Sequence, residues 1–286
     1  MIEDLLKAVG AKIDSSVAIS YGTQYRVSRG ADKAIVNVYA GKKGTSVVVQ
    51  MNTPLAEELR AKVGGPVSTP RAKGPSPYKA WIGSDESGKG DYFGPMVTAA
   101  VAVTAEQAAQ LAAWGVRDSK AMSDATAIAL ERKIEYLCRV KRVEWMPEAY
   151  NRRHGEALNV NRLLGEAHAE AIQALAAADG SLEAAVTDQF GDPGYVERAV
   201  RGLGCTIALV QRPKADETDV AAGAASVVAR AGFLRGLRAL EEQWEMRLPK
   251  GAGPETVAAA RAFVARYGRD ALGQVAKLHF RTTQGL

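Results

Sequence analysis

Acidic residues stand at the ends of three apolar segments that are typical of β-strands. Asp85 and Glu86 follow WIGS, Asp188 follows AAVT, and Asp216 with its neighbour Glu217 follows IALVQRPKA. Ligands gather at the carboxyl edge of open α/β sheets. If the three strands are neighbours in one sheet, these acids therefore converge in one small volume.

Such a cluster of carboxylates needs positive charge. Two like charges about 4 Å apart repel by roughly 4 kcal/mol at an effective dielectric constant near 20. Carboxylate oxygens suit Mg²⁺ and Mn²⁺, whereas the 3 histidines and 2 cysteines of the chain show no spacing typical of a zinc site. A pair of such ions activates water and stabilises the leaving oxygen of an in-line phosphoryl displacement. For any single acid the alternative is a helix cap or a solvated charge, most of all for Asp216 and Glu217, which precede a predicted helix.

Asp85 and Glu86 are adjacent in sequence, which limits where their strand can end if both are to reach one site. Because neighbouring residues of a strand point to opposite faces, the two acids share one site only where the strand ends and the chain turns. We expect Gly83, Gly88 and Gly90 to supply that break.

The segment GSDESGKG (83–90) nearly matches the P-loop pattern, which leaves two interpretations. A P-loop-like NTPase is the alternative function, with Asp188 as its second acid, although Gly90 stands where a P-loop has Ser or Thr. In the other interpretation, Gly88 and Gly90 let backbone amides approach a sugar-phosphate strand, and Lys89 neutralises a phosphate.

Two other polar patterns are less specific. In RDSK (117–120), Ser119 and Lys120 are candidate phosphate ligands, and a polar cap before the helix at Ser123 is an equally good interpretation. His168 lies in a long predicted helix, where we expect a packed or surface residue rather than a ligand.

The elements that must position these residues alternate between strands and helices, which predicts an α/β sheet covered on both faces. The predicted strands cover 78–85, 95–103, 140–146, 183–190 and 205–211, and the predicted helices cover 105–113, 123–137, 159–178, 193–203, 219–242 and 254–277. A smaller α+β domain precedes them, with helices at 1–13 and 53–63 and strands at 25–29, 34–40 and 46–52.

The predicted domains are an N-terminal domain at 1–65, a Gly- and Pro-rich linker at 66–78, and a catalytic domain at 79–286. All the excess positive charge lies in the first quarter, because residues 1–75 hold 11 Lys and Arg against 6 Asp and Glu, and the remainder is neutral. A neutral body with a basic appendage fits an enzyme that holds a polyanion. The N-terminus lacks a signal-peptide pattern and no run of 18 apolar residues occurs, so we expect a cytoplasmic protein without a membrane partner. We also expect a monomer.

Several motifs occur in order from about residue 80 to the C-terminus: IGSDESGKGDYFGP, GVRDSK, NVNRLLGEAH, AVTDQF, KADETDVAAGAASVVAR, LPKGA and KLHF. Together they resemble the bacterial ribonuclease HIII family, a type 2 ribonuclease H. The preceding YRV...VNVYAGKKGTSVVVQ is similar to the N-terminal domain of that family, which has a TATA-box-binding-protein-like fold and helps to hold the substrate.

The resemblance implies a ribonuclease H-like mixed sheet flanked by helices and endonucleolytic cleavage of the RNA strand of RNA/DNA hybrids, with 5′-phosphate products and Mg²⁺ or Mn²⁺ as cofactor. It implies these catalytic metal ligands: Asp85, Glu86, Asp188 and Asp216. It implies these substrate-binding residues: Gly88, Lys89, Gly90, Ser119 and Lys120. Asp216 stands where ribonucleases HIII usually have Glu, so Asp216 and Glu217 both remain candidates for the fourth ligand. A non-catalytic nucleic-acid-binding protein with structural acids is the remaining alternative.

Overall fold

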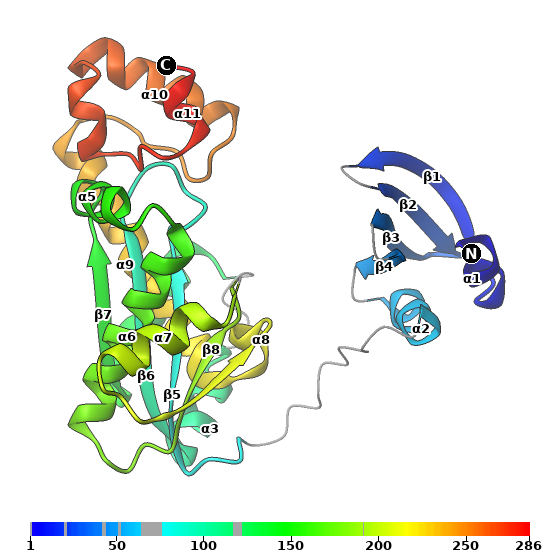
Figure 1. Cartoon of the computed structure of the whole chain (residues 1–286), viewed down its shortest axis with the longest axis horizontal. Helices are drawn as coiled ribbons and strands as arrows, with labels where there is room; N and C mark the ends of the chain where they lie inside the picture. The colour runs from blue at the N-terminus through cyan, green and yellow to red at the C-terminus, as the bar shows by residue number, and fades with distance from the viewer. Residues whose placement is uncertain are drawn as a thin grey trace. The chain divides into compact units, whose positions relative to one another are not determined.

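The structure, a computed structural model, describes residues 2–19, 22–41, 44–50, 53–63, 76–116, 122–190 and 192–286. The chain divides into two compact units, Met1–Ala72 and Lys73–Leu286 (Figure 1). The predicted linker at 66–78 lies mostly outside the described residues, so the domain boundaries 1–65 and 79–286 remain a proposal.

The first unit is an antiparallel sheet of four strands in the order β1-β2-β3-β4, covered on one face by two helices. Its elements are α1 (Ile2–Ala8), β1 (Lys12–Ile19), β2 (Gly22–Arg29), β3 (Asp32–Gly41), β4 (Gly44–Gln50) and α2 (Pro54–Val63). Buried apolar residues of the helices and of β2 and β3 form its core, among them Leu6, Val27, Val36, Leu55 and Leu59. The predicted α+β unit is thus confirmed.

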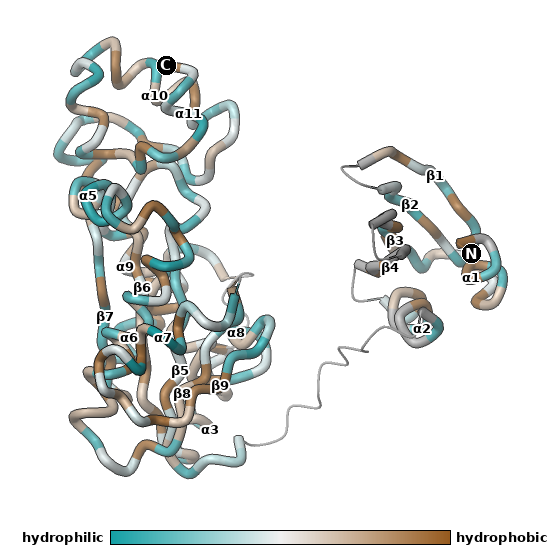
Figure 2. Tube along the Cα trace, in the orientation of Figure 1, coloured by the Kyte–Doolittle hydropathy of each residue, from teal (hydrophilic) through white to brown (hydrophobic). Residues whose placement is uncertain are grey.

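Strand β1 is the element that the sequence prediction missed in this unit. Its sequence KIDSSVAI mixes hydrophilic and hydrophobic residues along its length (Figure 2), and Ile13 and Val17 are exposed. A strand at a sheet edge with no buried face lacks the alternation by which strands are recognised.

The second unit is built on a five-stranded mixed sheet with the strand order β7-β6-β5-β8-β9. Strands β5, β6 and β7 are antiparallel neighbours, whereas β8 and β9 run parallel to β5. The strands are β5 (Ala80–Ser87), β6 (Met96–Thr104), β7 (Arg139–Trp145), β8 (Ala184–Asp188) and β9 (Ala208–Arg212). The helices are α3 (Ala105–Ala113), α4 (Asp124–Leu137), α5 (Pro147–Ala157), α6 (Val160–Ala178), α7 (Gly194–Gly202), α8 (Ala215–Thr218), α9 (Val220–Gln243), α10 (Pro254–Tyr267), the 3-10 helix η2 (Asp270–Gln274) and α11 (Arg281–Gln284).

Helices cover both faces of this sheet, as predicted. Helix α9 packs on β5 and β6 with α3 and α4 behind it, and α6 packs on the other face with α5 and α7 (Figure 1). Gly83, in the middle of β5, permits the closest approach, because a Cβ there would lie 2.0 Å from the backbone of Ala221 in α9. The short polar helix α5 was not predicted.

Helix α9 is, among the described residues, the helix whose length and composition would suit a membrane span. Of its most apolar window, 72% is buried inside the fold. Its apolar character is therefore accounted for by its place against β5 and β6 as the core helix of this unit.

The C-terminal segment fixes the loop that connects β5 to β6. The Lys277 side chain is fully buried, and its Nζ donates hydrogen bonds to the carbonyl oxygens of Asp91 at 2.9 Å and Gly94 at 2.7 Å. The Lys277 amide donates to the Tyr92 carbonyl at 2.8 Å. Burial lowers the pKa of Lys277 to about 7, although the nearby Asp91 charge acts to raise it.

The low pKa of Lys277 predicts a stability that depends on pH. Between about pH 7 and the ordinary lysine value of 10.5, the unfolded chain binds a proton at this residue that the folded chain does not. The free energy of unfolding of the wild type therefore rises with pH across this window, relative to that of Lys277→Met. The variant itself is less stable because the carbonyls of Asp91 and Gly94 lose their donor. Denaturant unfolding of both proteins at about pH 7.5 and about pH 9.5 measures the difference. A difference that is the same at both pH values would contradict this explanation.

Candidate functional site

The three strands that carry or precede the predicted acids, β5, β8 and β9, are neighbours and run in the same direction. Ser84 of β5 pairs with Thr187 of β8, and Asp188 of β8 pairs with Arg212 of β9. Asp85 and Asp188 therefore reach the same edge of the sheet, and the chain that leaves β9 enters α8, which carries Asp216. The parallel strands thus bring the ends of β5 and β8 to one sheet edge, as the sequence predicted, and convergence of the four acids into one site remains a proposal.

Of the three glycines expected to break the strand, Gly88 and Gly90 do lie in the turn after β5, but Gly83 lies inside the strand, which continues to Ser87. Asp85 consequently points to the α9 face of the sheet, where Ser226 hydrogen-bonds its carboxylate. Glu86 points to the α6 face, where its Oε2 lies 3.1 Å from His168 Nε2. The two acids thus point to opposite faces of the sheet, and both lie close to the end of β5.

The four carboxylates form a ring of mutual electrostatic influence. The pKa of Asp85 lies well above its ordinary value because the group is buried and because the charges of Glu86 and Asp216 lie near it. Burial also raises the pKa of Asp188, and the charges of Asp216 and Glu86 add to this, although the Ala215 amide opposes it. Each acid therefore lies near two others, and these neighbouring charges add to the effect of burial on Asp85 and Asp188.

The backbone after β9 brings Asp216 to Asp188. Lys214 has a left-handed conformation with φ of 56°, which is unusual for a residue with a side chain. The turn aims the Ala215 amide at Asp188 Oδ1, with a distance of 3.1 Å between the two atoms. Asp216 is buried, whereas the side chain of Glu217 is 41% exposed and lies 3.0 Å from Lys214 Nζ. The local fold therefore separates the two candidates for the fourth ligand.

Nearby groups stabilise the negative charge of Glu86 more than they stabilise the charges of Asp85 and Asp188, whose pKa values are raised. Burial acts to raise its pKa, but the hydrogen bond from His168, the charge of His168 and the Lys89 ammonium together lower the pKa below its ordinary value. Lys89 Nζ lies 3.8 Å from Glu86 Oε1 and 5.0 Å from the centre of the Phe190 ring. His168 is the site residue that sequence reasoning missed: it is packed, as expected, but it is packed against a site acid.

The glycine-rich turn after β5 is tightly packed at Gly88 and open to solvent at Gly90. Gly88 has φ of 90°, and a Cβ there would lie 2.2 Å from the Pro95 carbonyl oxygen. At Gly90 an added Cβ would meet no atom within 4 Å, so its backbone faces open space. A P-loop needs a helix after this turn, whereas the chain enters β6, so the P-loop interpretation is wrong.

The predicted phosphate ligands Ser119 and Lys120 lie outside the described residues. Lys89 and Gly90, by contrast, lie directly after the strand that carries Asp85 and Glu86.

The donor set fits a hard divalent cation. It consists of carboxylate oxygens, and burial together with the neighbouring negative charges raises the pKa of Asp85 and Asp188. Within the described ranges, however, no three His, Cys, Asp or Glu side chains are grouped closely enough to hold a metal ion. Four acids that repel one another are expected to close only around positive charge.

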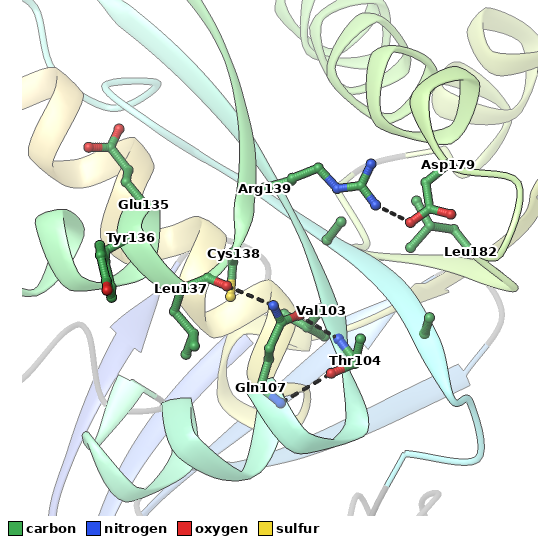
Figure 3. A pocket seen from close by; sticks show the side chains of 12 residues that line it. Val103, Thr104, Gln107, Glu135, Tyr136, Leu137, Cys138, Arg139, Asp179 and Leu182 are labelled. Carbon is green, nitrogen blue, oxygen red and sulfur yellow. Dashed lines mark hydrogen bonds and ion pairs between the residues drawn. The ribbon is translucent and has the colours of Figure 1, made fainter.

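A separate cavity of about 330 Å³ lies at the opposite end of the sheet, where β5 and β7 begin (Figure 3). Arg139 and Asp179 form an ion pair across it, and Gln107 donates a hydrogen bond to the Leu137 carbonyl. Burial raises the pKa of Cys138 to about 11, so this thiol is a poor nucleophile at neutral pH. None of the predicted site residues lines this cavity.

Comparisons with known proteins agree with this geometry. The model of the family "Ribonuclease HII" matches residues 82–283. The ribonuclease HIII of Chlamydia pneumoniae is 40% identical over 203 residues, which cover 70% of this chain and 68% of that protein. The crystal structure of Bst-RNase HIII in complex with Mn²⁺ is similar, with a TM-score of 0.69 and 29% identity over 99% of this chain and 94% of that one. The RNase H3 of Aquifex aeolicus, 22% identical over 98% of this chain and 95% of its own, shares the fold with a TM-score of 0.60.

Proposed function

Since the chain belongs to the ribonuclease HII family and is related to the ribonucleases HIII, we propose that it cleaves the RNA strand of RNA/DNA hybrids at a site made of four carboxylates. Ribonuclease H activity is that of the family. The proposal goes further in assigning the site, which consists of Asp85, Glu86, Asp188 and Asp216. The observation that carries it is the ring of acids at the carboxyl edge of β5 and β8, in which burial and neighbouring charges raise the pKa of Asp85 and Asp188.

The four acids would hold Mg²⁺ or Mn²⁺. When bound, a pair of such ions supplies the Lewis acidity that activates the attacking water and stabilises the departing 3′ oxygen. The contribution of the chain would be a set of oxygen ligands carried by two strands and one short helix, which would close around the ions. Because the bond to the 3′ oxygen would be the one that breaks, the phosphate would stay on the 5′ end of the downstream fragment, and no protein nucleophile would be required.

Asp216 is the better candidate for the fourth ligand. Its charge acts on both Asp85 and Asp188, whereas Glu217 pairs with Lys214 through both of its oxygens, at 3.0 and 3.1 Å. The Glu217 carboxylate is paired with Lys214 and 41% exposed, so it is a poorer metal ligand than the buried Asp216.

The turn after β5 is suited to recognise the RNA strand. The 2′-hydroxyl is the group that distinguishes RNA from DNA at a given position. The open backbone at Gly90 leaves room for a ribose, and Lys89, next to it, supplies a cation for a phosphate. Selectivity for RNA would thus come from the backbone of the turn that follows Asp85 and Glu86. Ser119 and Lys120 are also proposed to contact phosphates.

A hybrid-cleavage assay with a metal titration tests the proposed function. We expect a labelled RNA/DNA hybrid to be cut in its RNA strand with Mg²⁺ or Mn²⁺, to stay intact in a chelator, and to give 5′-phosphate ends. The same sequence as duplex DNA is the control substrate. Binding of the hybrid without metal-dependent cleavage would favour the non-catalytic alternative.

The basic N-terminal unit is proposed to hold the hybrid by its charge. Gln24 and Arg26 lie on the face of its sheet that points away from the helices, because Tyr25 and Val27 on the same strand face them. Contacts to phosphates give affinity that is independent of sequence and that falls as salt rises. We propose further that the enzyme acts as a cytoplasmic monomer.

Deleting residues 1–75 tests the role of this unit. We expect KM for the hybrid to rise about tenfold and its salt dependence to flatten, while kcat changes less than about threefold, because the lost contacts are to phosphates and not to reacting atoms. The remaining unit has its own two cores, and thermal unfolding checks that it stays folded. A salt slope equal to that of the full chain would contradict this role.

A further inference from the structure

The His168 side chain uses both of its ring nitrogens beside the proposed metal site. It lies on α6, is fully buried, and its Nε2 lies 3.1 Å from Glu86 Oε2. On the other side of the ring, Nδ1 lies 2.9 Å from Ser84 Oγ and 3.3 Å from Thr187 Oγ1. The Phe190 ring packs at 5.1 Å between ring centres. The imidazole is thus held on three sides.

The hydrogen bond to Glu86 has one direction. An ionised carboxylate has no proton to give, so His168 Nε2 donates to Glu86 Oε2. Nδ1 meets two hydroxyl groups, from Ser84 and Thr187, which both donate and accept. The arrangement therefore supports the bond to Glu86 whether or not the ring carries a charge.

Glu86 needs such a partner more than the other acids do. It points to the α6 face, whereas Asp85 points to the α9 face, and its longer side chain has one more torsion to fix than that of an aspartate. With Oε2 held by His168, Oε1 is the oxygen left to face the site, 3.8 Å from Lys89 Nζ. Groups that hydrogen-bond to metal-binding carboxylates orient those carboxylates.

We propose that His168 is a positioning residue for Glu86: it fixes the carboxylate through Oε2 so that Oε1 alone binds a divalent ion, while Ser84 and Thr187 fix the ring. The inference rests on the proposed function, because it takes Glu86 to be a metal ligand. The competing explanation is that His168 only fills the core between β5 and α6.

Two substitutions at this position separate the explanations. His168→Gln keeps an N–H donor that reaches about as far as Nε2, whereas His168→Leu keeps the volume and removes the donor. We expect His168→Leu to weaken Mn²⁺ binding to the free protein about 10- to 100-fold, and His168→Gln to restore most of the affinity. Free Mn²⁺ is counted by electron paramagnetic resonance in the absence of hybrid. The Mn²⁺ concentration for half-maximal cleavage should shift in parallel.

Ile172→Ala is the matched control for packing. Ile172 is fully buried one turn further along α6 in the same core, and it has no hydrogen-bonding group to offer Glu86. We expect it to lower the melting temperature without changing Mn²⁺ affinity. The positioning role is wrong if the Mn²⁺ affinity of all three variants falls in proportion to their melting temperature. It is also wrong if His168→Gln binds Mn²⁺ as weakly as His168→Leu does.

A milder variant keeps the test decisive if His168→Leu does not fold. Ser84→Ala with Thr187→Val leaves the imidazole and Glu86 in place but removes the hydroxyls that hold Nδ1, and we expect Mn²⁺ affinity to fall several-fold. Wild-type affinity in this variant would overturn the proposal. Mn²⁺ binding is measured without substrate, so a wild-type protein that fails to cut the hybrid refutes the proposed function and leaves the result on His168 to be judged separately.

Discussion

Asp85→Asn and Asp188→Asn each lower the rate of hybrid cleavage by at least about 10³-fold, because each removes a charged ligand from ions that supply several kcal/mol of transition-state stabilisation. Binding of the hybrid persists in both variants, since neither side chain is proposed to hold the nucleic acid. Cleavage is measured with Mn²⁺ in a single-turnover assay, and binding by fluorescence anisotropy in a chelator. Asp179→Asn, at the opposite end of the sheet, is the matched control and should cleave as the wild type does.

Asp85→Asn should also stabilise the metal-free protein at neutral pH. Its pKa is raised in the folded state above the ordinary value of 3.8, so folding penalises the ionised form. The penalty is absent below that value, where the group is protonated in both states, and it grows as pH rises toward the folded pKa. Asn carries no charge, so the variant should melt at a higher temperature than the wild type near pH 7. Loss of cleavage together with a lower melting temperature would indicate damage to the fold rather than loss of a ligand.

Asp216→Asn and Glu217→Gln should differ by at least about 10²-fold in cleavage rate. Asp216 acts on Asp85 and Asp188, so its loss should resemble theirs. Glu217 pairs with Lys214 near the surface, and an exposed pair of this kind contributes little, so its loss should change the rate less than about threefold. Rates at saturating Mn²⁺ and the Mn²⁺ dependence of each variant are measured together. A larger loss in Glu217→Gln than in Asp216→Asn would assign the fourth ligand to Glu217.

The convergence of the acids could be predicted from sequence because the signal is local. An apolar segment followed by Asp or Glu recurs before three turns, and parallel neighbours bring such ends together. Strands β5 and β6 and helices α3, α4 and α9 were recognised for similar reasons, since the apolar pattern lies within each segment and the Ser123 cap marks the start of α4.

The parts that were missed depend on contacts between distant residues. His168 lies in the apolar stripe of α6, between Leu164 and Ile172, so its burial is readable, but its partner Glu86 lies 82 residues away. The continuation of β5 past Gly83 likewise depends on pairing with β6, which no local pattern encodes. Lys277 is buried among the carbonyl oxygens of a distant loop, and no local sequence pattern predicts the burial of a single lysine.

The most direct test of the central claim is to locate Mn²⁺ by anomalous diffraction in crystals of the Asp188→Asn protein and of the wild type, each soaked with Mn²⁺ and bound to a hybrid analogue whose scissile linkage resists hydrolysis. The account predicts two peaks about 3.5–4 Å apart in the wild type, within bonding distance of Asp85, Glu86, Asp188 and Asp216, and the loss of at least one peak in the variant. Peaks that lie elsewhere, or wild-type crystals in which these carboxylates bind no Mn²⁺, would contradict it.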